Sequence, residues 1–549
     1  MRFVLVAAVA VTAASAQPAL SPTDRCATGA EPSARTVEAL FVDGRFDPFV
    51  VRSGLDETVL TLTVSDPAVV EIAWPTFYTT QAGVPVDSLV LRDDGAGADA
   101  AAGDGVFSAA PARLTYDGSF GPATGFFNGY RRARVTYADG RTERASVVLP
   151  LSLGILTDAV PIVRPQRGDL GAGLGAGIDR TDHLVATVGA FDDVEGATAT
   201  LLGLVPLEPD FVHIAAPHPD PLETAAGQFL HVKAEIGGIG LGTVDRSADF
   251  GATGALRGVV QTYPFPNPGL LNHELGHYWF AFLDPALDLN RGSHWAATER
   301  PSTGFGSPTW GAYPALTPAA GDTVRAALLP RDGHYNDLEL YLMGLVGPDA
   351  VASPIRALRD ADQVGIEAGT YVFVADGVRE VTMDEIVAAE GPRQPAVGQS
   401  PTAFSMATHV VYDRPLTDVE FSYFDYTLRA YEQASASGAG LSFEAATGGR
   451  ATLTTRMFST GVAVEDEPTR RPRLTLAGAN PVRDVVRFRL ADVPGDASLA
   501  IVDVLGRRVV ALPSGPTVLW DASGAAPGVY LAVLRHPGGT ATLRFTVAR

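Results

Sequence analysis

The stretch Leu271-Asn272-His273-Glu274-Leu275-Gly276-His277-Tyr278 contains the pattern H-E-x-x-H. In a helix, residues four positions apart lie on one face about one turn apart, so His273 and His277 can bind the same metal ion. Glu274 stands beside them, where its carboxylate can deprotonate a water molecule activated by that metal. The chain has 10 histidines and 62 acidic residues among 549. Random order of such a composition gives about 0.02 matches, so the pattern predicts a helical site for zinc-assisted hydrolysis.

A catalytic zinc site needs at least one more protein ligand and leaves a further position open for water. The compact continuation H-E-x-x-H-x-x-G-x-x-H is absent, because Phe280 and Asp284 occupy the positions of its glycine and its last histidine. We favour His294 as the third ligand. Glu299, at a separation similar to that of the glutamate ligand in thermolysin-like enzymes, and Glu339, on a predicted amphipathic helix, remain alternatives. Spacing alone does not choose among the three.

Length and composition indicate a folded protein with several domains. A chain of 549 residues is too long for one ordinary core, and its length suggests about three to four domains. The 58 glycines and 40 prolines indicate many turns and β-rich portions. A formal net charge of -21 disfavours binding to nucleic acid or to anionic membranes. Cys26 is the single cysteine, so no internal disulfide can form.

The N-terminus has the pattern of a secretory signal peptide. Arg2 precedes an apolar run from Phe3 to Ala14, and the run ends in Ala14-Ser15-Ala16. A positive residue, a short apolar core and an A-x-A ending are typical of such signals. No later segment reaches roughly 18 uninterrupted apolar residues. We therefore expect removal of residues 1–16 and a secreted or cell-surface protein with no transmembrane segment.

Residues 17–150 are expected to form an all-β, immunoglobulin-like sandwich, because polar and apolar residues alternate in runs such as 58–64. Within this region, closely spaced aspartates and glycines offer hard oxygen ligands on a tightly turning backbone, as calcium requires. Their spacing resembles the D-D-G…G-D-G-x-[FY] loop of bacterial immunoglobulin-like extracellular domains. It does not match the EF-hand pattern, and aspartate with glycine is also common in plain turns. Calcium binding and a simple turn therefore both remain open for Asp93, Asp94, Asp99 and Asp104.

Residues 151–461 mix strands, long loops and helices, so an α+β domain is expected. Predicted elements include a strand at 370–374 and helices at 383–390 and 424–434. A strand at 255–261 precedes the H-E-x-x-H helix. If this strand is exposed, it can pair with an extended peptide by main-chain hydrogen bonds and present a scissile bond to the metal.

An ordered series of motifs across roughly residues 150–460 resembles a group of secreted bacterial proteins of the zincin metallopeptidase type. The series comprises Gly237-Gly238-Ile239-Gly240, Leu256-Arg257-Gly258-Val259-Val260, His273 to Trp279, His294-Trp295, Leu338 to Gly344, Ala388 to Arg393 and Ala446 to Arg450. The resemblance implies a zincin-like catalytic domain. Peptidase activity with zinc as the cofactor, on protein or peptide substrates, is inferred from the metal motif.

Residues 462–473 combine charges with prolines and are expected to be a linker, and residues 474–549 are β-rich again. Their segments Asn480-Pro481, Ile501 to Val509, Trp520-Asp521 and Pro527 to Leu531 resemble the C-terminal sorting domain of type IX secretion cargo. The resemblance implies a small all-β sandwich that is recognised by the type IX secretion machinery. Release into the medium or attachment at the cell surface would follow.

Two functional hypotheses follow from these features. The first is a secreted zinc metalloendopeptidase in which Glu274 is the general base toward a metal-activated water. The second is a cell-surface adhesin or binding protein whose zincin site is structural or vestigial. The presence of Glu274 favours the first hypothesis, because a purely structural zinc site has no use for a general base.

Overall fold

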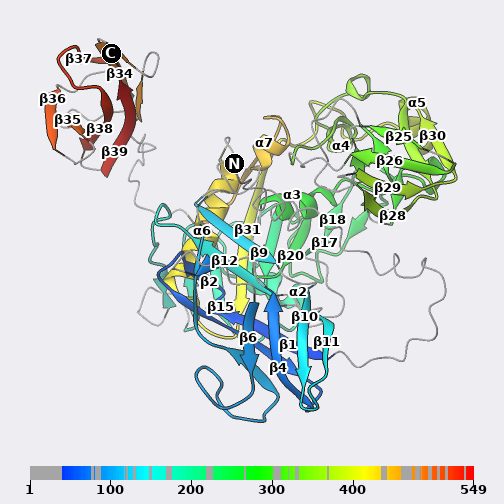
Figure 1. Ribbon diagram of the computed structural model, residues 1–549. Helices are drawn as coiled ribbons and strands as arrows, with labels where there is room; N and C mark the ends of the chain where they lie inside the picture. Colours follow the sequence, from blue (N-terminus) through cyan, green and yellow to red (C-terminus); the bar gives the residue numbers. More distant parts are fainter. Residues whose placement is uncertain are drawn as a thin grey trace. The chain divides into compact units, whose positions relative to one another are not determined.

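The computed structural model divides into two compact units, Met1–Ser459 and Thr460–Arg549, and each is described by itself. The chain is mostly β, as expected, with many separate sheets (Figure 1). The predicted signal peptide, Cys26 and residues 462–472 of the predicted linker lie outside the described residues. The described residues are 40–75, 79–80, 88–116, 118, 122–127, 131–147, 151–168, 176–217, 227–264, 268–292, 294–300, 311–313, 315–319, 321–327, 333–367, 370–433, 442–458, 473–476, 482–483, 485–491, 498–503, 507–512, 517–536 and 539–548.

The first part of the larger unit is all β, which confirms the strands expected there. Its main sheet runs β11-β10-β4-β6-β7-β3-β8-β5, and β1 also pairs with β3. Along β3, from Glu57 to Val64, every second residue is buried, so the alternation at 58–64 directs one face into the core. The other strands are β1 (Phe41–Asp47), β4 (Val69–Pro75), β5 (Thr79–Thr80), β6 (Ser88–Arg92), β7 (Val106–Ala109), β8 (Ala112–Thr115), β10 (Arg131–Tyr137) and β11 (Thr142–Val147).

A second, three-stranded sheet crosses the predicted domain boundary between residues 150 and 151. Its central strand β12 (Ser152–Leu156) runs parallel to β2 (Val50–Arg52) and antiparallel to β9 (Ala123–Phe127). All five residues of β12 are buried, because the strand is covered on both faces. The N-terminal sheets therefore extend to Leu156, beyond the expected end of the β-domain.

A mixed sheet forms the centre of the larger unit and carries the H-E-x-x-H helix. Its order is β13-β14-β15-β31-β16-β20-β17, and β32 also pairs with β31. The strands β15, β31, β16 and β20 are mutually parallel, whereas β17 joins β20 antiparallel at the end of the sheet. The strands are β13 (Gln166–Arg167), β14 (Ile178–Arg180), β15 (Leu184–Val188), β16 (Phe211–Ala215), β17 (Gly227–His231), β20 (Gly258–Thr262), β31 (Ala403–Tyr412) and β32 (Thr452–Thr454).

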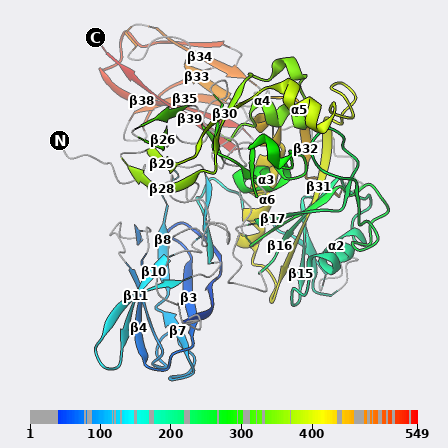
Figure 2. The same cartoon turned by 90° about the vertical axis from the view of Figure 1, so that its right-hand side faces the viewer.

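Helices cover both faces of this sheet (Figure 2). Val259 of β20 shares one hydrophobic cluster with Leu201, and its neighbour Val260 shares a different cluster with Leu271. Because successive side chains of a strand point to opposite faces, Leu201 and Leu271 mark helices on opposite sides. The helices are α2 (Val194–Leu202) with Leu201, α3 (Pro268–Gly276) with Leu271, α6 (Asp418–Glu432) and α7 (Phe443–Ala446).

The strand expected to bind an extended peptide is not at an edge. The predicted strand 255–261 is β20, whose five residues are buried between β16 and β17. Both of its edges are already hydrogen-bonded, so the expectation that it pairs with a substrate is wrong. Among the described strands, β17 is the one that ends the sheet on this side.

Between α3 and β31, the chain forms two further four-stranded sheets and two helices. One sheet runs β24-β23-β27-β30 and the other β25-β26-β29-β28. The predicted strand at 370–374 and helix at 383–390 match β29 and α5. The elements are β21 (Asn290–Arg291), β22 (His294–Trp295), β23 (Thr298–Glu299), β24 (Ala312–Tyr313), β25 (Leu316–Pro318), β26 (Thr323–Ala327), α4 (Asp337–Leu342), η4 (Pro348–Ala350), β27 (Ile355–Arg359), β28 (Asp362–Glu367), β29 (Thr370–Val374), β30 (Gly377–Val381) and α5 (Met383–Glu390).

The smaller unit is all β in its described residues and has its own core. One sheet runs β33-β34-β37 and the other β36-β35-β38-β39. Trp520, Tyr530 and Phe545 pack ring against ring inside a single hydrophobic cluster. The strands are β33 (Arg473–Leu476), β34 (Val485–Ala491), β35 (Ser498–Asp503), β36 (Arg508–Leu512), β37 (Thr517–Asp521), β38 (Gly528–His536) and β39 (Gly539–Val547).

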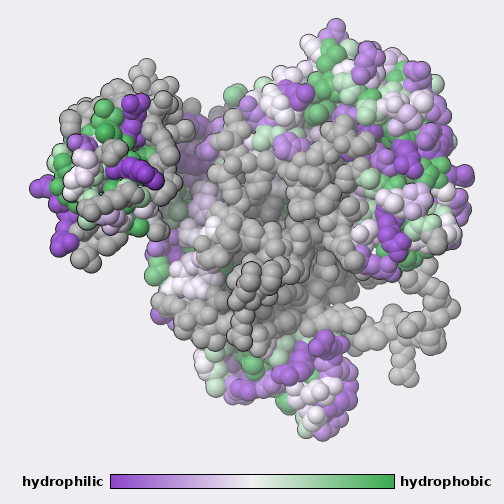
Figure 3. All heavy atoms as spheres, turned by 45° about the horizontal axis from the view of Figure 1, so that its top comes forward, coloured by the Kyte–Doolittle hydropathy of each residue, from purple (hydrophilic) through white to green (hydrophobic). Residues whose placement is uncertain are grey.

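None of the helices described is both long enough and apolar enough to cross a bilayer. On the face drawn in Figure 3, hydrophilic residues are interspersed with hydrophobic ones over the described part.

Candidate metal centre

Helix α3 and the turn that follows it carry the two histidines of the H-E-x-x-H pattern. The helix ends at Gly276, and the amide of His277 donates to the carbonyl of Glu274 at 3.0 Å. Such a bond spans three residues instead of four and tightens the last turn. His277 nevertheless keeps its place above His273, and their Nε2 atoms are 3.3 Å apart. The predicted pairing of these two side chains is therefore present.

Two tyrosine hydroxyls fix α3 through Asn272, the residue before the first histidine. Tyr335 donates to the Asn272 carbonyl at 2.6 Å, and Tyr431 donates to Asn272 Oδ1 at 2.7 Å. All three residues are buried. Buried hydrogen bonds of this kind are costly to break, so they hold the helix that carries His273 against α6 and the segment before α4.

His294 reaches the same point from a short hairpin. Strand β22 begins with His294 and pairs antiparallel with β21, so that His294 stands opposite Arg291. Gly292, in the connecting turn, has a φ of 62°, a conformation that glycine adopts without steric penalty. The Nε2 atoms of His294 and His273 are 3.2 Å apart. The hairpin thus brings His294 to His273 and His277.

Trp295, the next residue, anchors that hairpin in the core. Its ring lies 6.0 Å from the ring of Phe280 with an interplanar angle of 22°. Its indole Nε1 donates to Glu339 Oε1 at 2.9 Å, and Trp295 and Glu339 are both buried. The other oxygen of Glu339 accepts the amide of Asn336 at 2.8 Å, which forms half of a capping box at the start of α4. Glu339 therefore holds Trp295, and through it the position of His294.

The histidine cluster has the dimensions of a zinc site. One ring nitrogen from each histidine lies within 4.8 Å of the corresponding nitrogens of the other two. Zinc binds imidazole nitrogen at about 2.0–2.1 Å with tetrahedral angles, which places two nitrogens about 3.3–3.4 Å apart. The separations of 3.2 and 3.3 Å agree with this spacing. Burial lowers the pKa of His277 to about 3, with a smaller contribution from His294, so its ring is neutral and available as a ligand at pH 7.

Glu274 lies beside the cluster with 3% of its surface exposed. Burial raises its pKa to about 8, because a low-dielectric environment disfavours the charged carboxylate. A dication bound to the neighbouring histidines would favour the charged form again. The backbone at Gly227, the first residue of β17, passes so close that a Cβ there would lie 2.8 Å from Glu274 Oε1. The carboxylate therefore lies against the start of the edge strand.

The two alternative ligands, Glu299 and Glu339, lie outside the histidine cluster. Glu299 Oε2 accepts hydrogen bonds from Arg356 Nη1 at 2.7 Å and from the amide of Leu316 at 2.8 Å. Glu339 has the structural contacts described above. Although its separation from His277 along the chain is similar to that of a thermolysin-like ligand, Glu299 binds Arg356 and the amide of Leu316 instead of joining the histidines.

Three of the four candidate calcium ligands also come together. Carboxylate oxygens of Asp93, Asp99 and Asp104 lie within 4.8 Å of one another. Asp94 is not part of this group, and its Oδ1 instead accepts the amide of Ala96 at 3.0 Å.

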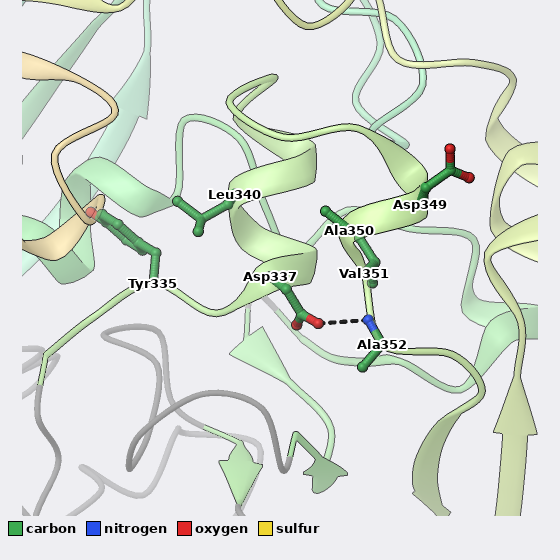
Figure 4. Close-up of a pocket in the computed structure, with 7 residues that line it drawn as sticks. All are labelled: Tyr335, Asp337, Leu340, Asp349, Ala350, Val351 and Ala352. Atoms are coloured by element: carbon green, nitrogen blue, oxygen red, sulfur yellow. Dashed lines mark hydrogen bonds between the residues drawn. The ribbon is translucent and has the colours of Figure 1, made fainter.

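A hollow of about 360 Å³ beside α4 and η4 is separate from the histidines (Figure 4). The Asp337 carboxylate faces it and accepts the amide of Ala352 at 2.7 Å. None of the three histidines lines it. Its lining residues are Tyr335, Asp337, Leu340, Asp349, Ala350, Val351 and Ala352.

Comparison with known proteins gives no family assignment. No family model and no curated protein matches the chain. PorZ, described as an essential surface component of the type IX secretion system of Porphyromonas gingivalis, is 27% identical over 17% of this chain and 13% of its own, with a TM-score of 0.13. A biofilm-associated protein BSP domain is 10% identical over 95% of this chain and 84% of its own, with a TM-score of 0.16.

The four N-terminal immunoglobulin domains of a Dscam1 isoform are 8% identical over 92% of this chain and 73% of their own, with a TM-score of 0.11. Scores this low define neither the fold nor the function of the chain. What the fold establishes is a mostly β chain of two compact units, the larger of which contains a cluster of three histidines, with His273 and His277 buried and His294 partly buried.

Proposed function

We propose that this chain is a secreted zinc-dependent endopeptidase. The observation that carries the proposal is the convergence of His273, His277 and His294 at zinc-like separations beside the buried Glu274. Three imidazole ligands are one of the ligand sets of catalytic zinc, and a neighbouring carboxylate can act as a general base toward a zinc-bound water. The mixed sheet with α3 lying against β20 and β17 is compatible with a zincin-like domain (Figure 1).

Each residue has a distinct role in this proposal. The three histidines would hold one zinc ion, which when bound supplies Lewis acidity to a water molecule and to the substrate carbonyl. Glu274 accepts a proton as the water oxygen forms a bond with the carbonyl carbon. Glu274 then donates that proton to the amine nitrogen as the C–N bond breaks. Bound zinc would favour the charged form of Glu274, which is the form that can accept the first proton.

The edge strand β17 supports an extended peptide as the substrate. An exposed strand edge can pair with a peptide through main-chain hydrogen bonds, which are independent of the peptide's sequence. β17 ends the described sheet, and its first residue, Gly227, lies against Glu274. A peptide paired with this strand would therefore run past the general base. This role replaces the one first expected of residues 255–261.

The number of ligands favours catalysis over a structural or vestigial site in a surface adhesin. Structural zinc sites are closed by four protein ligands, whereas catalytic sites have three and leave one position for water. The cluster contains three among the described residues. The buried Glu274 would serve no purpose in a structural site and costs free energy to bury. Both features support the enzyme.

The proposal includes export of the protein from the cell. The signal-peptide pattern of residues 1–16 and the resemblance of residues 474–549 to a sorting domain predict passage through the type IX secretion machinery. The separate core of the unit Thr460–Arg549 supports an independently folded domain. The expected location is the medium or the cell surface.

The test compares purified wild type with Glu274→Gln and with Glu380→Gln, which removes an exposed carboxylate on β30. Metal content is measured by mass spectrometry, and hydrolysis is measured on an unfolded, dye-quenched protein. We expect one zinc per chain in all three proteins, and hydrolysis by wild type and Glu380→Gln alone. Equal hydrolysis by Glu274→Gln would refute the mechanism, and absence of zinc would refute the site. Zinc without hydrolysis in any of the three would favour the adhesin.

A further inference from the structure

A second group of charged residues lies far along the chain from the histidines, in the N-terminal sheet. Residues 93–105 connect β6 to β7, two strands that pair antiparallel. Carboxylate oxygens of Asp93, Asp99 and Asp104 lie within 4.8 Å of one another in this loop. Three acidic groups so close repel one another in the absence of a cation.

The hydrogen bonds of the loop account for most of these oxygens. Asp93 Oδ1 and Oδ2 accept the amides of Gly103 and Gly105 at 2.5 and 2.9 Å. Asp104 Oδ1 accepts the amide of Val106 at 2.9 Å. These contacts are the ordinary chemistry of aspartate in turns, and by themselves they do not call for a metal.

Asp99 does not fit the turn explanation. Its side chain is 6% exposed. Oδ2 accepts the amide of Gly95 at 2.5 Å, but Oδ1 is buried and has no hydrogen-bond partner in the described part of the chain. Among the residues described, no arginine or lysine forms an ion pair with Asp93, Asp99 or Asp104. A buried carboxylate oxygen without a partner costs free energy, so this oxygen calls for a ligand that the described residues do not supply.

We infer that Asp93, Asp99 and Asp104 bind one calcium ion, with Asp99 Oδ1 as the buried ligand. Calcium takes six to eight oxygen ligands in flexible geometry, and three carboxylates with carbonyls and water can supply them. Magnesium demands a near-ideal octahedron and keeps several waters, which suits a partly buried loop less well. Asp94, whose carboxylate lies outside this group of three, is not a ligand.

The site would stabilise the N-terminal sheet, independently of any activity at the histidines. β7 pairs with β6 on one side and with β3 on the other. Calcium would therefore close the long connection at the end of three adjacent strands. An exported protein meets calcium at millimolar concentrations, for which sites with a dissociation constant of about 0.1–1 mM suffice.

The experiment measures calcium binding to the full chain by isothermal titration after chelator treatment, with magnesium as a parallel titrant. The variants are Asp99→Asn, Asp104→Asn and, as a matched control, Asp94→Asn. All three remove one negative charge from the same loop, so unspecific attraction to an acidic protein changes equally in each. We expect one calcium per wild-type chain, unchanged binding in Asp94→Asn, and affinity reduced about tenfold or more in the other two.

Two results would overturn the inference. One is no saturable binding by the wild type at calcium concentrations up to about 10 mM, tenfold above the weakest affinity expected. The other is an equal loss of calcium affinity in all three variants. Asp104 is exposed, so Asp104→Asn keeps the test decisive if Asp99→Asn fails to fold. Circular dichroism of each variant establishes that the β-structure is retained. Calcium-dependent protection of residues 93–105 from proteolysis in the wild type, lost in Asp104→Asn, would support the site by a second measurement.

Discussion

Glu339→Gln tests whether Glu339 supports the third histidine ligand or is itself a ligand. In the native chain, two buried donors approach separate oxygens of Glu339: Trp295 Nε1 at 2.9 Å and the amide of Asn336 at 2.8 Å. A glutamine side chain has one oxygen, and its NH₂ group would face the second donor. One buried hydrogen bond must therefore be lost, and the indole or the helix start must shift.

The size of the effect follows from those contacts. A hydrogen bond to a charged group contributes about 1.5–3 kcal/mol. A free-energy change of about 1.4 kcal/mol corresponds to a factor of ten in affinity. If the whole loss displaces His294 and appears in zinc binding, the zinc affinity falls about 10- to 100-fold. The same range is typical when an outer-shell partner of a zinc ligand is removed. His294→Ala removes a ligand directly and should weaken binding further than that.

The assay is zinc competition with a chromophoric chelator, together with the visible absorption of cobalt-substituted protein, which reports coordination geometry. Glu299→Gln is the control, because Glu299 was the other candidate carboxylate and its contacts are with Arg356 and Leu316. We expect the order of zinc affinity to be wild type and Glu299→Gln, then Glu339→Gln, then His294→Ala. Unchanged zinc affinity in His294→Ala, with loss of zinc from Glu339→Gln or Glu299→Gln, would refute the assignment.

Three further predictions address the general base, the core and the metal. Gly227→Ala places a Cβ 2.8 Å from Glu274 Oε1, so it should lower kcat/KM about 100-fold while zinc content stays unchanged. Gly242→Ala is the control and should have no effect, because a Cβ at Gly242 meets no atom within 4 Å. Burial lowers the pKa of His213 from 6.5 to about 3, so its neutral form stabilises the fold above pH 6.5 and that stability is lost as pH falls toward 3. Denaturant unfolding should show this acid loss, at most about 5 kcal/mol, and a flatter profile in His213→Gln. Zinc removal should lower the unfolding temperature of the larger unit and leave that of the smaller unit unchanged.

The first half of the candidate metal centre could be predicted because it depends on local spacing. His273 and His277 are one helical turn apart, and that spacing brings their nitrogens together even though the helix ends at Gly276. The contribution of His294 depends instead on a hairpin, on the packing of Trp295 and on Glu339, which is 44 positions further along the chain. No periodicity in the sequence encodes such a contact. For that reason, spacing left His294, Glu299 and Glu339 as alternatives, and the supporting roles of Trp295 and Gly227 had no local signal.

The same distinction explains the errors in the fold. Alternation predicts that residues 58–64 form a strand with one buried face, and β3 does so, because a strand's own side chains determine which face is apolar. Alternation does not say which strands lie next to each other. The position of the strand at 255–261 before the H-E-x-x-H helix favours peptide binding, but Gly258–Thr262 is buried on both faces and paired on both edges. Five consecutive buried residues are the pattern of an inner parallel strand, but two of them, Gln261 and Thr262, are polar, so no continuous apolar run marks this strand in the sequence. An edge near the general base had to come from another strand, and β17, which antiparallel pairing places at the end of the sheet, meets Glu274 through a glycine.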